Sequence, residues 1–223
     1  FLLPLLLIVP ERHSAIEVTN GAIRAAYAEL RSTMAKIGKY RNLVIFLGAY
    51  WLYVGGVFTI IVMAVDYGKR LGFADADLLL ALLITNFVGF PATLLYGLGA
   101  QRFGTKKAIY FALAIYMGAC LWGLVMGTFE EFLVMAVIIG CVQGGVQGLS
   151  RSLYASLIPK GQPGEFFGFY NMVNKISHFV VPGMVVITAM LSDYPKWIHL
   201  ALIPLFFCCS FLLGRVRVPQ PSV

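Results

Sequence analysis

Long apolar runs separated by short polar segments fill most of this chain. Six of the runs hold roughly 18 to 26 residues, and a helix needs about 20 to cross a bilayer. They cover residues 42–65, 78–99, 108–127, 132–157, 166–191 and 197–214. Pro91, Pro182 and Pro204 fall inside these runs, where membrane helices tolerate proline because neighbouring helices satisfy the freed backbone groups. The pattern predicts an all-α membrane protein whose residues 42–214 form a six-transmembrane-helix bundle.

The segments outside the six runs have a different composition. Residues 1–10 are apolar but too short to span, and we expect them to be the end of a preceding transmembrane helix in a longer protein. Residues 11–41 are polar and basic, with apolar positions at helical spacing after the capping candidates Thr19 and Asn20. These apolar positions are Ile23, Tyr27, Leu30, Met34 and Ile37. We predict an amphipathic linker helix, which either lies on the membrane surface or is a simple connection, and a tail at residues 215–223.

Polar side chains recur at helical spacing within two of the runs. Gln143 and Gln147 share one face, and beside them glycines 140, 144 and 148 form a small-residue stripe that lets another helix approach closely. In the next run, four polar residues share a face: Asn171, Asn174, Lys175 and His178. Ionisable residues inside a membrane usually mark a solute or ion path. We therefore take both faces as a candidate substrate-binding or coupling site.

Each of these candidates also has a structural interpretation. Lys175 suits substrate or proton binding, but an ion pair between helices or partial snorkelling would also account for a lysine at this depth. His178 either titrates near neutrality or packs as a hydrogen-bonded ring. Gln143 and Gln147 either face a cavity or bind neighbouring helices.

Four further residues are candidates on the same grounds. Tyr50, Tyr53 and Thr59 follow a helical stripe in residues 42–65, and they either line the same cavity or belong to aromatic packing. Arg151 lies near the end of its run, and we expect it to anchor the membrane interface or a gate network.

The composition supports a membrane protein and excludes several functional classes. Of the 223 residues, 60% are hydrophobic and 12% are charged, and the mean hydropathy is +0.84. The four cysteines lie in apolar runs without metal-ligand spacing, so we expect neither a metal nor another cofactor. The sequence holds no phosphate-binding glycine loop, and it shows no constellation of residues typical of an intramembrane enzyme. Despite the net charge of +7, we expect the partner to be the lipid bilayer and no nucleic acid.

The basic residues lie mostly on one side of the predicted bundle. Thirteen of the 17 lysines and arginines are on the side of residues 11–41, three are on the other side, and Lys175 is within the membrane. An excess of basic residues marks the cytoplasmic side. We therefore expect a multi-pass protein of the bacterial inner membrane with its linker and C-terminus in the cytoplasm.

The loop between the second and third runs has a recognisable pattern. It contains Gly97, Gln101, Arg102, Gly104, Lys106 and Lys107. This arrangement resembles the cytoplasmic loop signature of the major facilitator superfamily, which joins the second and third helices of each six-helix half. Gln101 stands where that family prefers aspartate, which argues against a charged gate latch. We expect Gly97 to permit close helix approach, and the basic cluster to hold the loop at the cytoplasmic face and pair with helix ends.

A narrower resemblance covers almost the whole chain. Residues 46–61, 147–152 and 158–168 resemble the vacuole-effluxer-like branch of that superfamily, named for a fungal vacuolar amino-acid exporter. The resemblance implies the C-terminal half of a twelve-helix secondary transporter, whose partner is the missing N-terminal six-helix half. It also implies transport of a small polar solute by alternating access, with amino acids as the suggested cargo and protons as the suggested coupling ion. Gly55 replaces the acidic or amide residue of the family pattern, which argues against carboxylate-based proton coupling in this half. The alternative is a non-transporting membrane scaffold or receptor of the same fold.

Overall fold

The computed structural model describes residues 31–159, 163–190 and 197–217. The predicted helix end at residues 1–10, the caps Thr19 and Asn20, and most of the predicted linker helix lie outside these residues. A short helix at residues 31–38 precedes six longer ones. They are α3 (Arg41–Arg70), α4 (Asp75–Phe103), α5 (Thr105–Gly123), α6 (Phe129–Leu157), α7 (Pro163–Met190) and α8 (Trp197–Arg215). The described residues contain no strand.

Each predicted run corresponds to one of the long helices, so the all-helical class is confirmed. Within the described residues, α3, α4 and α6 are long and apolar enough to cross a membrane. α5 and α8 are shorter, at 19 residues each, and α7 interrupts its apolar residues with the polar face around Lys175. Six membrane spans therefore stay a prediction, whereas the helices themselves are observed.

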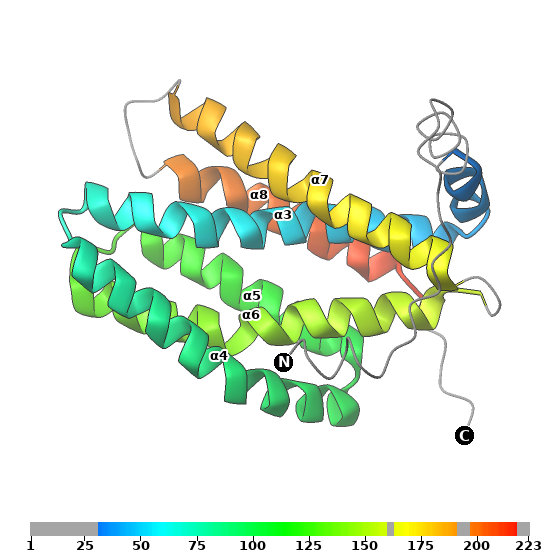
Figure 1. Cartoon of the computed structure of the whole chain (residues 1–223), viewed down its shortest axis with the longest axis horizontal. Coiled ribbons are helices and arrows are strands. Elements are labelled where there is room, and N and C mark those ends of the chain that lie inside the picture. The colour runs from blue at the N-terminus through cyan, green and yellow to red at the C-terminus, as the bar shows by residue number, and fades with distance from the viewer. Residues whose placement is uncertain (1–30, 160–162, 191–196, 218–223) are drawn as a thin grey trace, which may run out of the picture.

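The six long helices form two groups of three (Figure 1). α3 packs against α7 and α8, whereas α6 packs against α4 and α5. The groups meet where α5 contacts α8 and α3 contacts α6. Exchanging α3 with α6, α4 with α7 and α5 with α8 turns the pairs α3–α7 and α3–α8 into α6–α4 and α6–α5, and it leaves the pairs α5–α8 and α3–α6 unchanged. The chain thus consists of two three-helix units with equivalent contacts, and α3 and α6 are the central helix of each group.

The crossing of α3 and α7 depends on a glycine and a hydroxyl group. The Ser177 hydroxyl of α7 donates a hydrogen bond to the Trp51 carbonyl oxygen of α3. One turn further along α3, Gly55 lies directly against Ser177 and Val181, and a β-carbon at Gly55 would overlap both side chains. The absence of a side chain at Gly55 therefore allows this close approach.

The crossing of α6 and α4 has the same design. Thr85 Oγ1 of α4 lies 3.3 Å from the Ala136 carbonyl oxygen of α6, while it also donates to the Ala81 carbonyl oxygen at 2.8 Å. One turn further along α6, a β-carbon at Gly140 would lie only 2.7 Å from the Thr85 carbonyl oxygen. In both crossings, a hydroxyl group of one helix contacts a carbonyl oxygen of the other helix, and this carbonyl lies one turn before a glycine.

Polar contacts hold helix ends together at the end of the bundle where α3 begins. Lys106 Nζ, in the first turn of α5, donates to two carbonyl oxygens at the end of α8, that of Gly214 at 3.0 Å and that of Val216 at 2.7 Å. Burial lowers the pKa of the Lys106 ammonium group. Lys36 of the short helix forms a 2.7 Å ion pair with Glu165 in the first turn of α7. The short helix at residues 31–38 is therefore fixed to the bundle.

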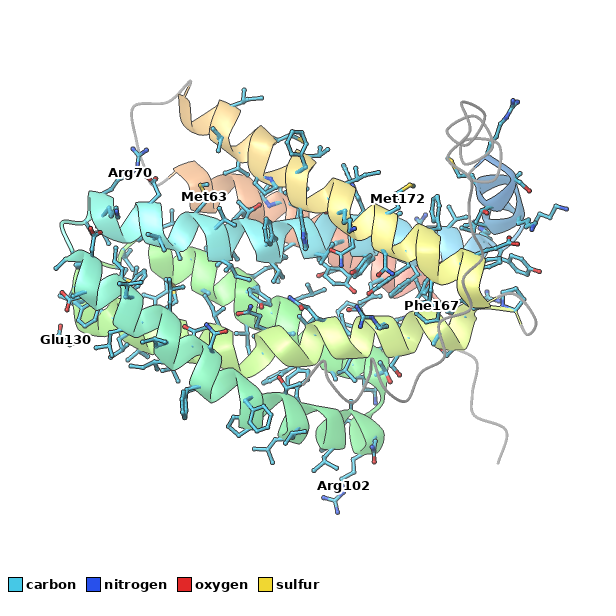
Figure 2. All side chains as sticks on the ribbon, in the orientation of Figure 1. Met63, Arg70, Arg102, Glu130, Phe167 and Met172 are labelled. Atoms are coloured by element: carbon cyan, nitrogen blue, oxygen red, sulfur yellow. The ribbon has the colours of Figure 1, made fainter. Side chains whose placement is uncertain are left out.

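At the opposite end, α6 begins with a capping box. Thr128 Oγ1 accepts the Glu131 N–H, while Glu131 Oε2 accepts the N–H groups of Gly127 at 2.9 Å and Thr128 at 3.2 Å. These backbone hydrogen bonds hold the pKa of the Glu131 carboxyl group below its ordinary value. Figure 2 shows Arg70 and Glu130 at this end and Arg102 at the other. The predicted division of the loops between two ends matches this arrangement.

Candidate functional site

A cluster of four tyrosines fills the region where α3, α6 and α7 meet. The ring of Tyr170 lies between two others, 4.3 Å from Tyr50 and 4.7 Å from Tyr154, centroid to centroid and nearly parallel. Tyr53 meets the edge of Tyr50 at 5.5 Å and an interplanar angle of 85°. All four rings are buried. We call Tyr50, Tyr53, Tyr154 and Tyr170 the tyrosine cluster.

Hydrogen bonds fix the cluster to helix backbones. Ser150 Oγ donates to the Val146 carbonyl oxygen at 2.5 Å, and since the serine hydroxyl has one proton, Tyr53 is the donor in the 2.5 Å Tyr53–Ser150 bond. Tyr154 donates to the Phe166 carbonyl oxygen at 2.8 Å, which connects α6 to the beginning of α7. The predicted candidates Tyr50 and Tyr53 are thus inside the packed core of this chain, and a role in lining a cavity stays a prediction.

The polar face of α7 divides into two stripes. Asn171 and Lys175 are exposed, whereas Asn174 and His178 are half-buried. The His178 ring stacks on Phe58 of α3, with the centroids 4.1 Å apart and the planes 9° from parallel. Figure 2 shows Phe167 between α7 and α6, and Met172 on the opposite side of α7. The exposed stripe is therefore open to a solute or to another part of the protein.

Asn174 joins this face to the tyrosine cluster. Its side chain interacts with the Tyr50 hydroxyl, which also lies beside the Tyr170 hydroxyl. The Asn174 Oδ1 atom is buried and has no hydrogen-bond partner among the described residues. A buried acceptor without a donor is unfavourable by about 1–3 kcal/mol. The acceptor is enclosed by the protein in this arrangement, so a bound molecule with a donor group could satisfy it only after neighbouring side chains move.

Arg151 supplies a positive charge at the same place. Its side chain is exposed on α6, one residue after Ser150, and it lies within electrostatic range of the Tyr50 and Tyr170 hydroxyls. The sequence predicted an interface or gate role for Arg151 and did not associate it with the tyrosines. In the structure it adds a cation within electrostatic range of the tyrosine cluster.

Gln143 and Gln147 lie elsewhere, in a polar cleft between α4 and α6. The cleft has a volume of about 230 Å³, and its walls include Thr85, Asn86 and Thr93 of α4. The predicted glycine stripe explains part of this geometry, because Gly140 and Gly144 bring α6 against Thr85 and Thr93, respectively. The candidate residues therefore occupy two places, the tyrosine cluster with the α7 face and the α4–α6 cleft.

Sequence reasoning did not identify the α4 wall of this cleft. Thr85, Asn86 and Thr93 lie at positions i, i+1 and i+8 of α4, a short polar stripe inside an otherwise apolar run. That stripe was visible in the sequence. Only the close contact of α4 with α6 shows that it faces the glutamines.

Two predicted positions on α3 are occupied by packing contacts. Thr59 is fully buried, and its hydroxyl donates to the Gly55 carbonyl oxygen one turn earlier at 2.7 Å. Gly55 is the close-approach residue of the α3–α7 crossing, so a larger side chain has no room there. The departure from the family pattern at Gly55 thus coincides with a close contact between α3 and α7.

The loop signature has separate structural roles for its residues. Gly104 has φ +93°, a left-handed conformation that favours glycine, and it separates α4 from α5. Gln101, Arg102 and Lys107 are exposed, whereas Lys106 contacts the end of α8. A β-carbon at Gly97 would meet nothing within 4 Å in the described part of the chain. No other described helix therefore comes close to α4 at Gly97.

The described residues contain no cluster of three or more histidine, cysteine or acidic side chains that could hold a metal ion. They include the four free cysteines, Cys120, Cys141, Cys208 and Cys209. The chemistry of the site is accordingly that of hydroxyl, amide, guanidinium and ammonium groups. Such groups bind polar solutes by hydrogen bonds and charge.

The comparisons with known proteins point to one family. The family described as "Vacuole effluxer Atg22 like" matches residues 1–217. The chain is 37% identical over 216 residues to "Uncharacterized MFS-type transporter YxiO" of Bacillus subtilis, which covers 97% of the chain and 50% of that protein.

Fungal relatives match at lower identity. The chain is 26% identical over 210 residues to "Autophagy-related protein 22-1" of Aspergillus niger, covering 86% of the chain and 34% of the relative. It is 25% identical over 176 residues to "Autophagy-related protein 22-2" of Emericella nidulans, covering 72% and 30%. The chain thus spans half the length of the Bacillus relative and about a third of each fungal one.

Proposed function

Because the chain belongs to the vacuole effluxer Atg22-like family, we propose that it forms one half of a secondary active transporter for a small polar solute. Alternating access places the solute site between two helical units that rock about it. The exposed stripe of Asn171 and Lys175 is the face that a second six-helix half would cover. A lysine left against lipid costs about 2.5–3.5 kcal/mol on insertion scales, which favours such a partner.

The observation that carries the proposal is the buried Asn174 Oδ1 acceptor beside Tyr50 and Tyr170. An ammonium group would donate a hydrogen bond to this oxygen, and the tyrosine faces would favour its charge. Arg151 lies within electrostatic range of the same tyrosines and suits a carboxylate. An acceptor and a guanidinium group at one site match a zwitterion, so we propose amino acids as the solute class.

Proton coupling would involve Lys175 or His178, the two ionisable side chains on the polar face of α7. His178 stacks on Phe58 and is therefore partly shielded, whereas Lys175 is exposed. We propose Lys175 as the residue whose charge matters for transport.

Transport by the intact protein in proteoliposomes tests this function. Lys175→Ala should reduce the uptake of radiolabelled amino acids far more than it reduces the yield of folded protein. Lys175→Arg should be intermediate, because the charge is kept while its geometry changes.

Ile176→Ala is the matched control, since Ile176 is the exposed neighbour of Lys175 and carries no charge. It should transport like the wild type. Equal transport by all variants would assign Lys175 a purely structural role. If no amino acid shows saturable uptake, the proposed solute class is wrong.

A further inference from the structure

A basic pocket lies where α3 begins and α8 ends. Four cationic residues line it: Lys39 and Arg41 next to the start of α3, and Arg215 and Arg217 at the end of α8. Its volume is about 810 Å³. This pocket is separate from the tyrosine cluster and from the α4–α6 cleft.

Negative charge near the pocket is already neutralised. No carboxylate of the described residues lines the pocket, and Glu165, which precedes the Phe166 ring that contacts Tyr40, is paired with Lys36. The carbonyl oxygens at the end of α8, which would repel an anion, accept hydrogen bonds from Lys106. The four cationic residues therefore have no anionic partner among the described residues.

The Arg215 side chain keeps hydrogen-bond donors available, and the start of α3 adds a positive field. The Arg215 guanidinium stacks on the Phe211 ring at 4.7 Å, an arrangement that leaves its in-plane N–H groups able to bind a ligand. Arg41 is the first residue of α3, where Tyr40 provides no side-chain cap and the first turn holds no acidic residue. The positive end of the α3 dipole thus adds to the field of the arginines.

The pocket also has an apolar wall, whose accessible part is formed by Ile45 of α3 and Leu157 at the end of α6, whereas Leu43 is fully buried. Val44, next to these residues, is exposed at 44%. A small soluble anion has no apolar surface to bury against such a wall, whereas the glycerol and acyl groups of a lipid would pack against it. Cationic and apolar surface therefore meet at one helix end of an apolar bundle.

We propose that this basic pocket binds the phosphate group of an anionic phospholipid. The phosphate would lie between the side chains of Arg41 and Arg217, with the glycerol group against Ile45 and Leu157. Such a lipid would connect the beginning of α3 to the end of α8. Basic pockets between helices on the cytoplasmic side are suited to anionic head groups.

Native mass spectrometry of the intact protein in detergent tests the proposal with three probes. These are dioctanoyl phosphatidylglycerol, dioctanoyl phosphatidylcholine and inorganic phosphate. The chain should bind phosphatidylglycerol saturably and in preference to the other two. Arg41→Gln and Arg217→Gln should each weaken that binding by about five-fold, the usual contribution of one basic residue at a membrane surface.

Arg31→Gln is the matched control, because Arg31 is exposed on the short helix, outside the pocket, and the charge change is the same. It should leave the affinity for phosphatidylglycerol within two-fold of wild type, and Arg41→Lys should retain most of it. An equal loss in Arg31→Gln would reduce the effect to net charge and overturn the site. Phosphate binding as tight as phosphatidylglycerol binding would overturn the assignment to a lipid.

Discussion

At the scale of single residues, two buried polar atoms have no partner in the described part of the chain, and they have different surroundings. Asn174 Oδ1 lies beside the tyrosine cluster, on the face of α7 that carries Lys175. The Tyr116 hydroxyl lies on α5, where the ring stacks on Phe206 of α8 at 5.9 Å. An unsatisfied atom in a packed core lowers stability without a benefit, whereas one in a binding site is satisfied when the ligand arrives.

This difference predicts opposite effects of two substitutions that remove the unpaired atoms. Asn174→Leu should leave the unfolding temperature unchanged or raise it, because it removes a buried acceptor, and should lower transport at least ten-fold, because the solute loses its acceptor. Tyr116→Phe should likewise not lower the unfolding temperature, but transport should stay at the wild-type level. Thermal unfolding in detergent and uptake by proteoliposomes of the intact protein measure the two quantities. Unchanged transport in Asn174→Leu would remove Asn174 from the site.

The sequence could identify polar residues on α7 but not their surroundings. Helical spacing places Asn171, Asn174, Lys175 and His178 on one side, as the structure shows. It cannot tell that the side chains of Asn174 and His178 are half-buried against α3 while Asn171 and Lys175 are exposed. That distinction arises from the angle at which α7 crosses α3, which depends on residues more than 100 positions away.

At the scale of elements, α6 contains two glycines in opposite situations. A β-carbon at Gly140 would lie 2.7 Å from the backbone oxygen of Thr85, whereas one at Gly148 would meet nothing within 4 Å. The backbone of α4 cannot yield as a flexible side chain can. Close packing of α4 on α6 therefore requires glycine at position 140.

We predict that Gly140→Ala destabilises the protein by about 1–3 kcal/mol, the usual effect of overpacking. Gly148→Ala should be neutral or stabilising by up to about 1 kcal/mol, because alanine favours helix and finds space there. Thermal unfolding of the two variants in the same detergent provides the comparison. Equal unfolding temperatures for both variants would show that α4 and α6 can move apart at position 140 without a loss of stability.

A comparison of predicted and observed helix bounds shows which helix ends the apolar pattern can predict. The predicted run 132–157 and the observed α6 end at the same residue, but α6 begins three residues earlier, at Phe129. The capping residues Thr128 and Glu131 are polar and look like a loop when only hydropathy is considered. Likewise α3 continues past the predicted end at residue 65 to Arg70, whose side chain pairs with Asp66 one turn earlier at 2.8 Å. Polar helix ends, set by hydrogen bonds and ion pairs, are the part that apolar runs miss.

At the scale of the whole molecule, the two ends of the bundle differ in charge. Lys106, Arg151 and Arg217 belong to the end where α3 begins, and Arg70 and Glu130 to the other. The excess of basic residues at the first end predicts that it faces the cytoplasm.

Accessibility of single cysteines tests this orientation in a version of the protein without its native cysteines. Thr105→Cys, at the start of α5, should react with a membrane-impermeant thiol reagent only from the cytoplasmic side. Asp75→Cys, at the start of α4, should react only from the other side. The reverse pattern would contradict both the orientation and the place given to the loop signature.

The central position of α3 has a consequence for the order in which the protein is made. In its most apolar stretch 61% of the residues are buried, against 11% in α4, and its main partners are α7 and α8. The ribosome must add 92 residues after Arg70 before Pro163 begins α7. At 5–20 residues per second this takes roughly 5 to 20 s. During that interval the newly made α3 lacks α7 and α8, the helices that will cover it. The insertion machinery must therefore shield α3 until α7 and α8 have been made.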